Sequence, residues 1–374
     1  MALPTQDHIF VRSPFIIQVD DLTQTGSKVE LFIYKAGFAP PATPTYTLSK
    51  LIPASNDTRT LYNLSPYVRE YITHPTSPDN INTDLQPTPI AEYALIDVYT
   101  YNLIAGNYVL QFTETYRAFD GYGDYETGIN PNYSIGKFVA LGETGKTYYY
   151  YYDASTYPTT SESLAGTLTA FLPINYIVLY TDLVNGLNHT FTATTADVYD
   201  LYRVPTSMIN NGANIKVITP TLPPTIVFNS DFRPVEECKY EPVVLDFINK
   251  YGGYQREAFF KASFESLEVQ STPYNFMQSF DSSMTYDIKQ GQKQIFNNNG
   301  GIKYKINSGW VEEDFAENLQ ELLLSERVLW TKGNTKLPIR INTKSINKEK
   351  NINNKKINYS LEFEMAFDVI NNVI

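Results

Sequence analysis

The chain has 374 residues and a formal net charge of −11, with 14% aromatic side chains and only 18% charged ones. That length accommodates two or three domains with buried cores, and the low charged fraction excludes a fully disordered chain. No run approaches 18 apolar residues, which excludes a transmembrane helix, and the acidic balance disfavours generic binding to DNA phosphates.

Strand-like alternation begins near the N-terminus. Val29, Leu31 and Ile33 recur at every second position, which is the pattern of a half-buried strand. A short apolar run at residues 15–19 precedes them, and a turn-forming segment at residues 21–26 separates the two runs. We expect these two runs to form a hairpin-like unit with a loop of several residues.

A second pair of strands is predicted at residues 93–101 and 108–116, with a turn at residues 102–107 between them. Ala94, Ile96 and Val98 fall on one face of the first strand. No segment between the predicted strands has helical periodicity, so their spacing favours antiparallel sandwiches over parallel strands joined by helices.

Two loops interrupt this pattern. Residues 73–89 include four prolines and lack apolar periodicity, so we expect this loop to project from the sandwich and to be a candidate contact region. Residues 119–131 combine Gly, Asp and Tyr, and include Asp120, Asp124 and Glu126. These carboxylates could act on a sugar or bind an ion, but their spacing misses the known calcium loop, and acidic residues in glycine-rich turns are usually solvated turn formers.

Five consecutive tyrosines follow in a predicted strand, and further strands are expected at residues 176–180 and 189–193. A strand with tyrosine on both faces cannot easily bury every hydroxyl, so we expect at least two hydroxyls to meet water or a partner. This run is therefore a candidate protein interface, formed by Tyr148, Tyr149, Tyr150, Tyr151 and Tyr152.

The last third of the chain has a different pattern. Strands are predicted at residues 241–249 and 258–268, around a turn at residues 249–253. Residues 311–328 predict one amphipathic helix, whose apolar stripe consists of Phe315, Leu319, Leu322 and Leu323. Residues 359–367 alternate without interruption between large apolar side chains and polar or small ones, which is the strongest strand pattern in the chain.

These patterns predict a mainly β protein built from two or three antiparallel β-sandwich domains of the immunoglobulin-like type, with an α+β C-terminal part that contains one helix. We place an N-terminal sandwich at residues 1–130, a tyrosine-rich β region at residues 131–235 and the C-terminal domain at residues 236–374.

A basic segment lies in the C-terminal part and contains Lys344, Lys348, Lys350, Lys355 and Lys356. A solvated hairpin tip is the simplest interpretation, and nucleic-acid binding is disfavoured because no aromatic residues interleave with the lysines. Residues 1–235 carry 12 basic and 21 acidic groups, so the segment could instead meet the acidic part of a neighbouring subunit. Head-to-tail contacts of that kind generate rings when the rotation closes.

Residue types that catalysis commonly uses are scarce. The three histidines, His8, His74 and His189, lie far apart, which leaves little for zinc, haem or histidine chemistry. Cys238 is the single cysteine and fits a reducing compartment, while the glycines of residues 291–301 do not form a phosphate-binding loop. We therefore assign no catalytic, cofactor-binding or metal-binding residue and expect a protein that is not an enzyme.

Several segments together resemble a known family. In the C-terminal part they are residues 238–242 (CKYEP), 247–253 (FINKYGG), 308–314 (SGWVEED), 322–327 (LLLSER) and 358–367 (NYSLEFEMAF), and in the N-terminal part residues 64–71 (LSPYVREY) and 128–131 (GINP). The chain is similar in these segments to virion proteins of tailed phages of Bacteroidota, especially the crAss-like phages. Among these it most resembles a ring protein of the tail barrel.

This resemblance implies a structural role in a short-tailed particle. Such proteins form stacked twelvefold rings around the nozzle that delivers DNA, so the expected partners are further copies of the chain and the adjacent ring and nozzle proteins. The expected location is the virion tail, after synthesis in the host cytoplasm, with no membrane insertion and no sequence-specific binding of nucleic acid. Two alternatives stay open: a receptor- or glycan-binding tail protein, and a glycan-cleaving tail enzyme that uses Asp120, Asp124 and Glu126.

Overall fold

The structure is a computed structural model in which 54% of the residues form strands and 7% are helical, which confirms the prediction of a mainly β protein. It describes residues 6–35, 37–53, 58–72, 88–89, 93–132, 139–141, 143–151, 167–172, 174–193, 198–203, 208, 210–235, 239–277, 279–280, 282–289, 291–332, 335–348 and 357–370. The immunoglobulin-like type of the sandwiches stays a prediction.

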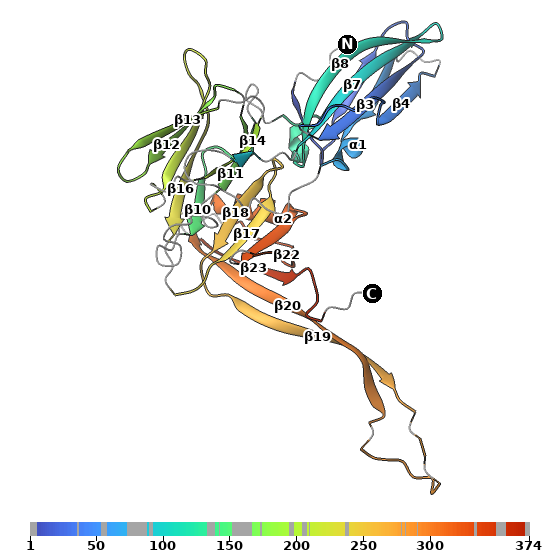
Figure 1. Cartoon of the computed structure of the whole chain (residues 1–374), viewed down its shortest axis with the longest axis vertical. Helices are drawn as coiled ribbons and strands as arrows, with labels where there is room; N and C mark the ends of the chain where they lie inside the picture. The colour runs from blue at the N-terminus through green and yellow to red at the C-terminus, as the bar shows by residue number, and fades with distance from the viewer. Residues whose placement is uncertain are drawn as a thin grey trace.

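The N-terminal part consists of two layers around one core (Figure 1). The larger sheet has the strand order β1 (His8–Phe10), β8 (Asn107–Phe119), β7 (Ala94–Ile104), β3 (Gly26–Lys35) and β4 (Tyr46–Leu51). The smaller layer contains β2 (Ile16–Asp20), β5 (Arg59–Asn63) and the short helix α1 (Ser65–Arg69). The core between them includes Ile17, Val29, Tyr62 and Ile96.

One of the two hairpins predicted in this part is confirmed and the other is wrong. β7 and β8 form the second predicted hairpin, and Ala94, Ile96 and Val98 are buried on one face. β2, however, pairs with β5, while β3 pairs with β4 and β7. Ile17 and Val29 belong to different layers and share one core, because face-to-face packing buries both apolar faces at once.

The middle part contains two sheets. The first has the order β10 (Thr147–Tyr151), β16 (Ile226–Val235), β15 (Ala213–Ile218), β12 (Ile177–Asp182) and β13 (Asn188–Thr192). The second has the order β6 (Thr88–Pro89), β14 (Val198–Arg203), β11 (Thr167–Leu172) and β9 (Val139–Leu141). The end of the predicted 73–89 loop thus belongs to a strand, whereas residues 73–87 lie outside the described residues. β10 runs parallel to β16, as β1 does to β8, although we predicted antiparallel sandwiches.

The C-terminal part is built on one sheet of seven strands. Their order is β18 (Tyr254–Phe259), β17 (Val243–Ile248), β21 (Val328–Lys332), β22 (Thr335–Ile341), β23 (Ile357–Met365), β20 (Lys293–Val311) and β19 (Phe264–Asn275). The helix α2 (Phe315–Leu324) packs on this sheet and buries Phe315, Leu319 and Leu322 in the C-terminal core. A short 3₁₀ turn, η1 (Tyr125–Thr127), lies in the loop after β8.

In the C-terminal part the predicted types of element are correct, but their boundaries are inexact. β23 has the predicted alternation, with Ile357, Tyr359, Leu361 and Phe363 buried. α2 is shorter than the predicted helix at residues 311–328, because Val311 ends β20 and residue 328 begins β21. The strand predicted at residues 258–268 corresponds to the end of β18 and the start of β19, which lie on opposite edges of the sheet.

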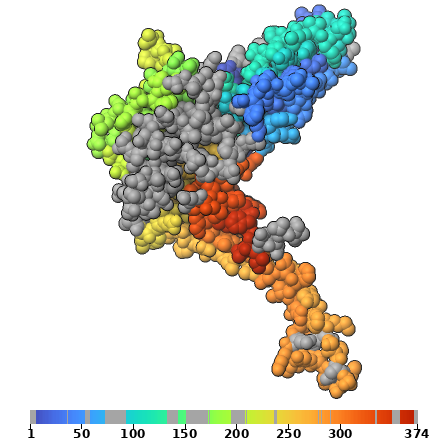
Figure 2. Space-filling model, viewed as in Figure 1, coloured from blue at the N-terminus to red at the C-terminus, as the bar shows by residue number. Residues whose placement is uncertain are grey.

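The molecule is elongated (Figures 1 and 2). The N-terminal sheet lies at one end, the middle and C-terminal sheets form the body, and the hairpin of β19 and β20 extends away from the body at the other end. The β17–β18 hairpin occupies the centre, and all residues of both strands are buried.

The N-terminal part contacts the body through close backbone packing at Gly121. The amide of Tyr122 donates to the carbonyl of Lys250 at 2.8 Å, in the turn between β17 and β18. A Cβ at Gly121 would lie 2.4 Å from Phe10 Cδ1 and 2.6 Å from the carbonyl oxygen of Lys250. Only glycine therefore allows this approach of the two parts.

We expect Gly121→Ala to lower the free energy of unfolding by about 1–3 kcal/mol, because the added methyl group forces backbone of two parts of the chain apart. Urea denaturation followed by circular dichroism measures the change. Gly301→Ala is the matched control, because a Cβ there has nothing within 4 Å. Equal losses in the two variants would contradict the role of Gly121 as a packing contact.

Candidate interaction surface and buried polar cluster

The projecting hairpin is the most exposed part of the structure, and we call residues 264–301 the arm. All 12 residues of β19 are exposed, as are most residues of β20 before Gly300. β19 is the edge strand of its sheet, and Pro273 lies at a register shift within it. Proline is tolerated at such positions because an edge strand has only one hydrogen-bonded neighbour.

One face of the arm continues the face that forms the C-terminal core. Near the body, the Tyr304 ring is buried between Trp330 and Phe363, with ring centroids 4.9 and 5.2 Å away. Beyond it, Leu267 lies opposite Ile302 and is 60% exposed, and Val269 is 53% exposed. The apolar stripe thus passes from the core into solvent without a change of pattern.

The tip of the arm, residues 276–292, carries further exposed apolar side chains. The rings of Phe280 and Tyr286 contact edge to face within the tip, and those of Tyr274 and Phe296 do so at its base, in β19 and β20. Large apolar side chains stand in solvent with exposed fractions of 87% for Met277, 80% for Met284 and 85% for Ile288. Large apolar side chains that are this exposed are typical of a binding surface, and methionine suits a surface that adapts to a partner.

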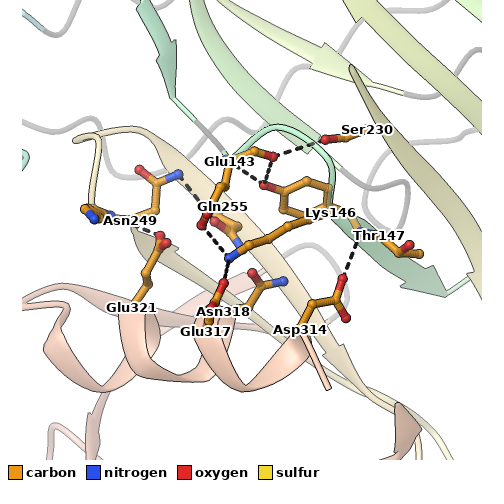
Figure 3. A network of polar contacts seen from close by, with 12 residues as sticks. Glu143, Lys146, Thr147, Ser230, Asn249, Gln255, Asp314, Glu317, Asn318 and Glu321 are labelled. Atoms are coloured by element: carbon orange, nitrogen blue, oxygen red, sulfur yellow. Dashed lines mark hydrogen bonds and ion pairs between the residues drawn. The ribbon is translucent and has the colours of Figure 1, made fainter. Parts of the chain in front are cut away.

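A second feature lies where β10, β18 and α2 meet, and Figure 3 shows its side chains. We call it the buried polar cluster. Lys146 is its centre, with its Nζ atom 2.5 Å from a carboxylate oxygen of Glu143 and 2.6 Å from one of Glu317. Burial alone would lower the pKa of Lys146, but these two carboxylates outweigh it and raise the pKa. The backbone amide of Thr147 donates to Asp314 at 3.3 Å, so the cluster joins the middle sheet to α2.

Two buried carboxyl groups complete the cluster. Glu257 has no exposed surface and accepts hydrogen bonds of 2.8 Å from Gln255 and Asn318. Burial raises its pKa to about 8. Glu321 accepts a hydrogen bond of 3.1 Å from the amide of Lys250, and burial raises its pKa to about 7.

Raised carboxyl pKa values are common in active sites, but they also arise in structural networks. Here the cause is burial between packed elements, and the Glu257 side chain does not reach the surface where a substrate could meet it. A pocket of about 480 Å³ lies elsewhere, beside α1, and is lined in part by Arg12 and Arg69. Both guanidinium groups pair with Glu326, and Arg12 also donates to the carbonyl of Leu324, so they hold the N-terminal part to the end of α2.

The tyrosines of the predicted interface do not form one surface in the structure. Tyr148 and Tyr150 are buried in the middle core, and the Tyr148 hydroxyl accepts from the amide of Glu143 and donates to its carbonyl. The interface prediction is therefore wrong for Tyr148 and Tyr150, because other parts of the same chain cover both side chains. Tyr149 points the other way and packs against Phe315 of α2. The side chain of Tyr151 and the whole of Tyr152 lie outside the described residues.

The predicted basic segment is described only in part. Lys344 and Lys348 are exposed on the stretch between β22 and β23, in agreement with a solvated segment. Lys350, Lys355 and Lys356 lie outside the described residues, as does Cys238.

The acidic loop after β8 belongs to the junction between the N-terminal part and the body. Asp124 forms an ion pair with Lys250, and the backbone around Gly121 contacts the β17–β18 turn. Glu126 is exposed in η1. Within the described ranges, no three His, Cys, Asp or Glu side chains gather closely enough to hold a metal ion.

The sequence patterns missed the arm. They end a strand at residue 268 and assign no role to the apolar residues beyond it. The alternation of Leu267 and Val269 with polar residues was a weak signal, and the tip has no periodicity. Apolar residues normally indicate burial in the chain's own core, so only the structure reveals that these are exposed.

Comparison of the chain with protein-family models, with curated proteins and with solved structures finds no match. In the part of the chain that the structure describes, no helix combines the length and apolar character needed to span a bilayer.

The buried polar cluster makes stability depend on pH. Between about pH 4.5 and pH 8 the folded chain keeps the proton of Glu257 whereas the unfolded chain releases it, so stability falls as pH rises through this window. We expect Glu257→Gln to be more stable than the native chain by about 1–3 kcal/mol near pH 8.5 and nearly equal near pH 5. Urea denaturation at both pH values measures the difference.

The control is Glu126→Gln, which removes an exposed carboxylate from the loop after β8. It should leave the pH profile unchanged. If Glu257→Gln keeps the pH profile of the native chain, then Glu257 does not retain its proton in the folded chain across this pH window.

Proposed function

We propose that the protein is a structural subunit that assembles with further copies of itself, as a ring protein in the tail barrel of a phage similar to the crAss-like phages. The observation that carries the proposal is the arm, which exposes apolar side chains near the body, at Leu267 and Val269, and again at its tip. A two-stranded hairpin alone is marginally stable in water, so a surface that covers it contributes to its stability.

The extent of the arm supports a permanent contact. Within the arm, β19 has 12 residues and β20 has nine, at positions 293–301, and together they fall within the roughly 20–30 residues that a standard interface uses on each side. Subunits of permanent assemblies bury more, about 2,000–5,000 Å² per contact, and such area resists shear. An arm that reaches away from the body can make that contact without distorting the subunit's own cores.

The family resemblance supports the more specific part of the proposal. It adds a closed ring of about twelve copies, stacking on adjacent ring and nozzle proteins, and a place in the virion tail. The candidate carboxylates fit a structural role better than catalysis, because Asp124 pairs with Lys250 and Glu257 is enclosed between packed elements. In this proposal the layered sheets of each subunit form the wall of the ring, with sandwiches of the immunoglobulin-like type.

A second candidate function, binding of a host glycan, is favoured by the outer face of the N-terminal sheet. The rings of Phe32 and Tyr99 lie 5.0 Å apart, and the Tyr101 hydroxyl donates to Glu30 at 2.8 Å. The planes of these half-buried rings are inclined by 60°, and they offer ring faces for stacking with the hydrogen-bond acceptors of a carboxylate beside them. Loss of glycan binding in Tyr99→Ala, with unchanged assembly, would favour this function over the ring.

The mass of the purified chain in solution, together with negative-stain images, tests the proposal. We expect closed rings of near twelve copies. A compact trimer would instead support receptor binding. The proposal would be overturned if the chain is monomeric in solution and virions do not contain it in the copy number of a ring.

A triple substitution at the tip, Met277→Ser, Met284→Ser and Ile288→Ser, tests the arm within that assembly. We expect an unchanged melting temperature, because these side chains are exposed, and a loss of the ring species. The matched control replaces Val184 and Leu187, which are exposed in the turn after β12, by serine. Rings of native abundance in the tip variant would contradict the role of the arm.

A further inference from the structure

The N-terminal sheet has an open edge along β8. β1 pairs with β8 only at Arg117, Ala118 and Phe119. No other described strand pairs with the outer edge of β8 at residues 107–115. Nine residues of extended chain span roughly 30 Å, so this edge offers a long row of backbone donors and acceptors.

The same edge carries exposed apolar side chains. Tyr108, Val109, Leu110 and Phe112 are each more than two-fifths exposed, and Glu114 is the single charged residue between 107 and 115. The outermost strands of the N-terminal and five-stranded middle sheets are shorter, with three residues in β1, six in β4 and five each in β10 and β13. Natural edge strands are usually short or charged, so a long, nearly uncharged edge is suited to receive an added strand.

The arm offers a matching strand. β19 is also an edge strand, with 12 exposed residues and the apolar side chains of Leu267 and Val269. Glu268 is paired with Lys303 of β20, so the stretch from Ser266 to Thr272, which ends before Pro273, presents little uncompensated charge. Two neutral edges of similar length can pair through their backbones while their apolar side chains cover each other.

The two edges lie at opposite ends of the molecule, so one chain cannot pair them with each other (Figure 1). A second copy supplies the missing partner for each. We propose that β19 in the arm of one copy adds as a strand to the β8 edge of the next copy. This inference rests on the proposed function, because it specifies the contact by which copies assemble.

Contact between unlike surfaces has a geometric consequence. A pairing of arm with arm would cover β19 and leave β8 open, whereas the arm–β8 contact covers both edges. Such a head-to-tail contact is heterologous, and its repetition gives a ring when the rotation closes. The arm tip then extends past the paired strands and adds contact area on the second copy.

Two lysine variants and their mixture test the contact. Leu110→Lys with Phe112→Lys charges the β8 edge, and Leu267→Lys with Val269→Lys charges the arm. All four side chains are exposed, so both variants should melt as the native chain does. Charged residues on an edge oppose strand addition, so we expect each variant alone to be monomeric by analytical ultracentrifugation.

Mixing the two variants leaves one intact arm and one intact β8 edge, so the mixture should form dimers and nothing larger. The control, Val184→Lys with Leu187→Lys, should assemble as the native chain does. Native assembly in either edge variant, or a mixture that stays monomeric, would overturn the arm–β8 contact while leaving the proposed ring function intact. A native chain that is monomeric at every concentration, and that virions do not contain in ring stoichiometry, would overturn both.

Discussion

The body of the protein depends on the β17–β18 hairpin, because this hairpin is covered on both faces. One face contributes Leu245 and Phe247 to the core under α2, and the other packs Val244 and Ala258 against the middle sheet. The turn of the hairpin contacts the backbone at Gly121 of the N-terminal part. Three parts of the chain therefore meet on a single pair of strands, and their relative placement follows from it.

Because the hairpin is buried on both faces, the charged side chains of Asp246 and Arg256 lie in the interior. Neighbouring groups of opposite charge neutralise them. Arg256 donates two hydrogen bonds to Asp246, at 2.5 and 2.9 Å, and Lys336 and Thr331 each approach the same carboxylate at 2.8 Å. Burial alone would raise the pKa of Asp246, but the two cations lower it to about 2. Such a network adds specificity of pairing among the strands rather than much net stability. Specific contacts thus fix the interior of the chain, while the open strand edges of β8 and β19 lie at its two ends.

Fold prediction from the sequence succeeded where a pattern reports on burial within one element. The alternation at β23 and the stripe of Phe315 and Leu319 identify a strand and a helix, because each side chain's environment follows from the period of its own element. The sequence did not predict which strands pair with each other. β2 pairs with β5 and only shares a core with β3, which lies in the other layer. The site was predicted least well, because Tyr148 and Leu267 have similar apolar character in sequence, yet one is buried and the other exposed.

By itself, the sequence determined that the protein is mainly β, with one amphipathic helix near the C-terminus, because strand and helix periods are local properties of the chain. Only the tertiary structure decided which apolar side chains are covered. It buried Tyr148 and Tyr150, placed Asp124 opposite Lys250, and left the arm and the β8 edge open. Coverage depends on contacts between residues far apart in the chain, and no local pattern encodes those contacts.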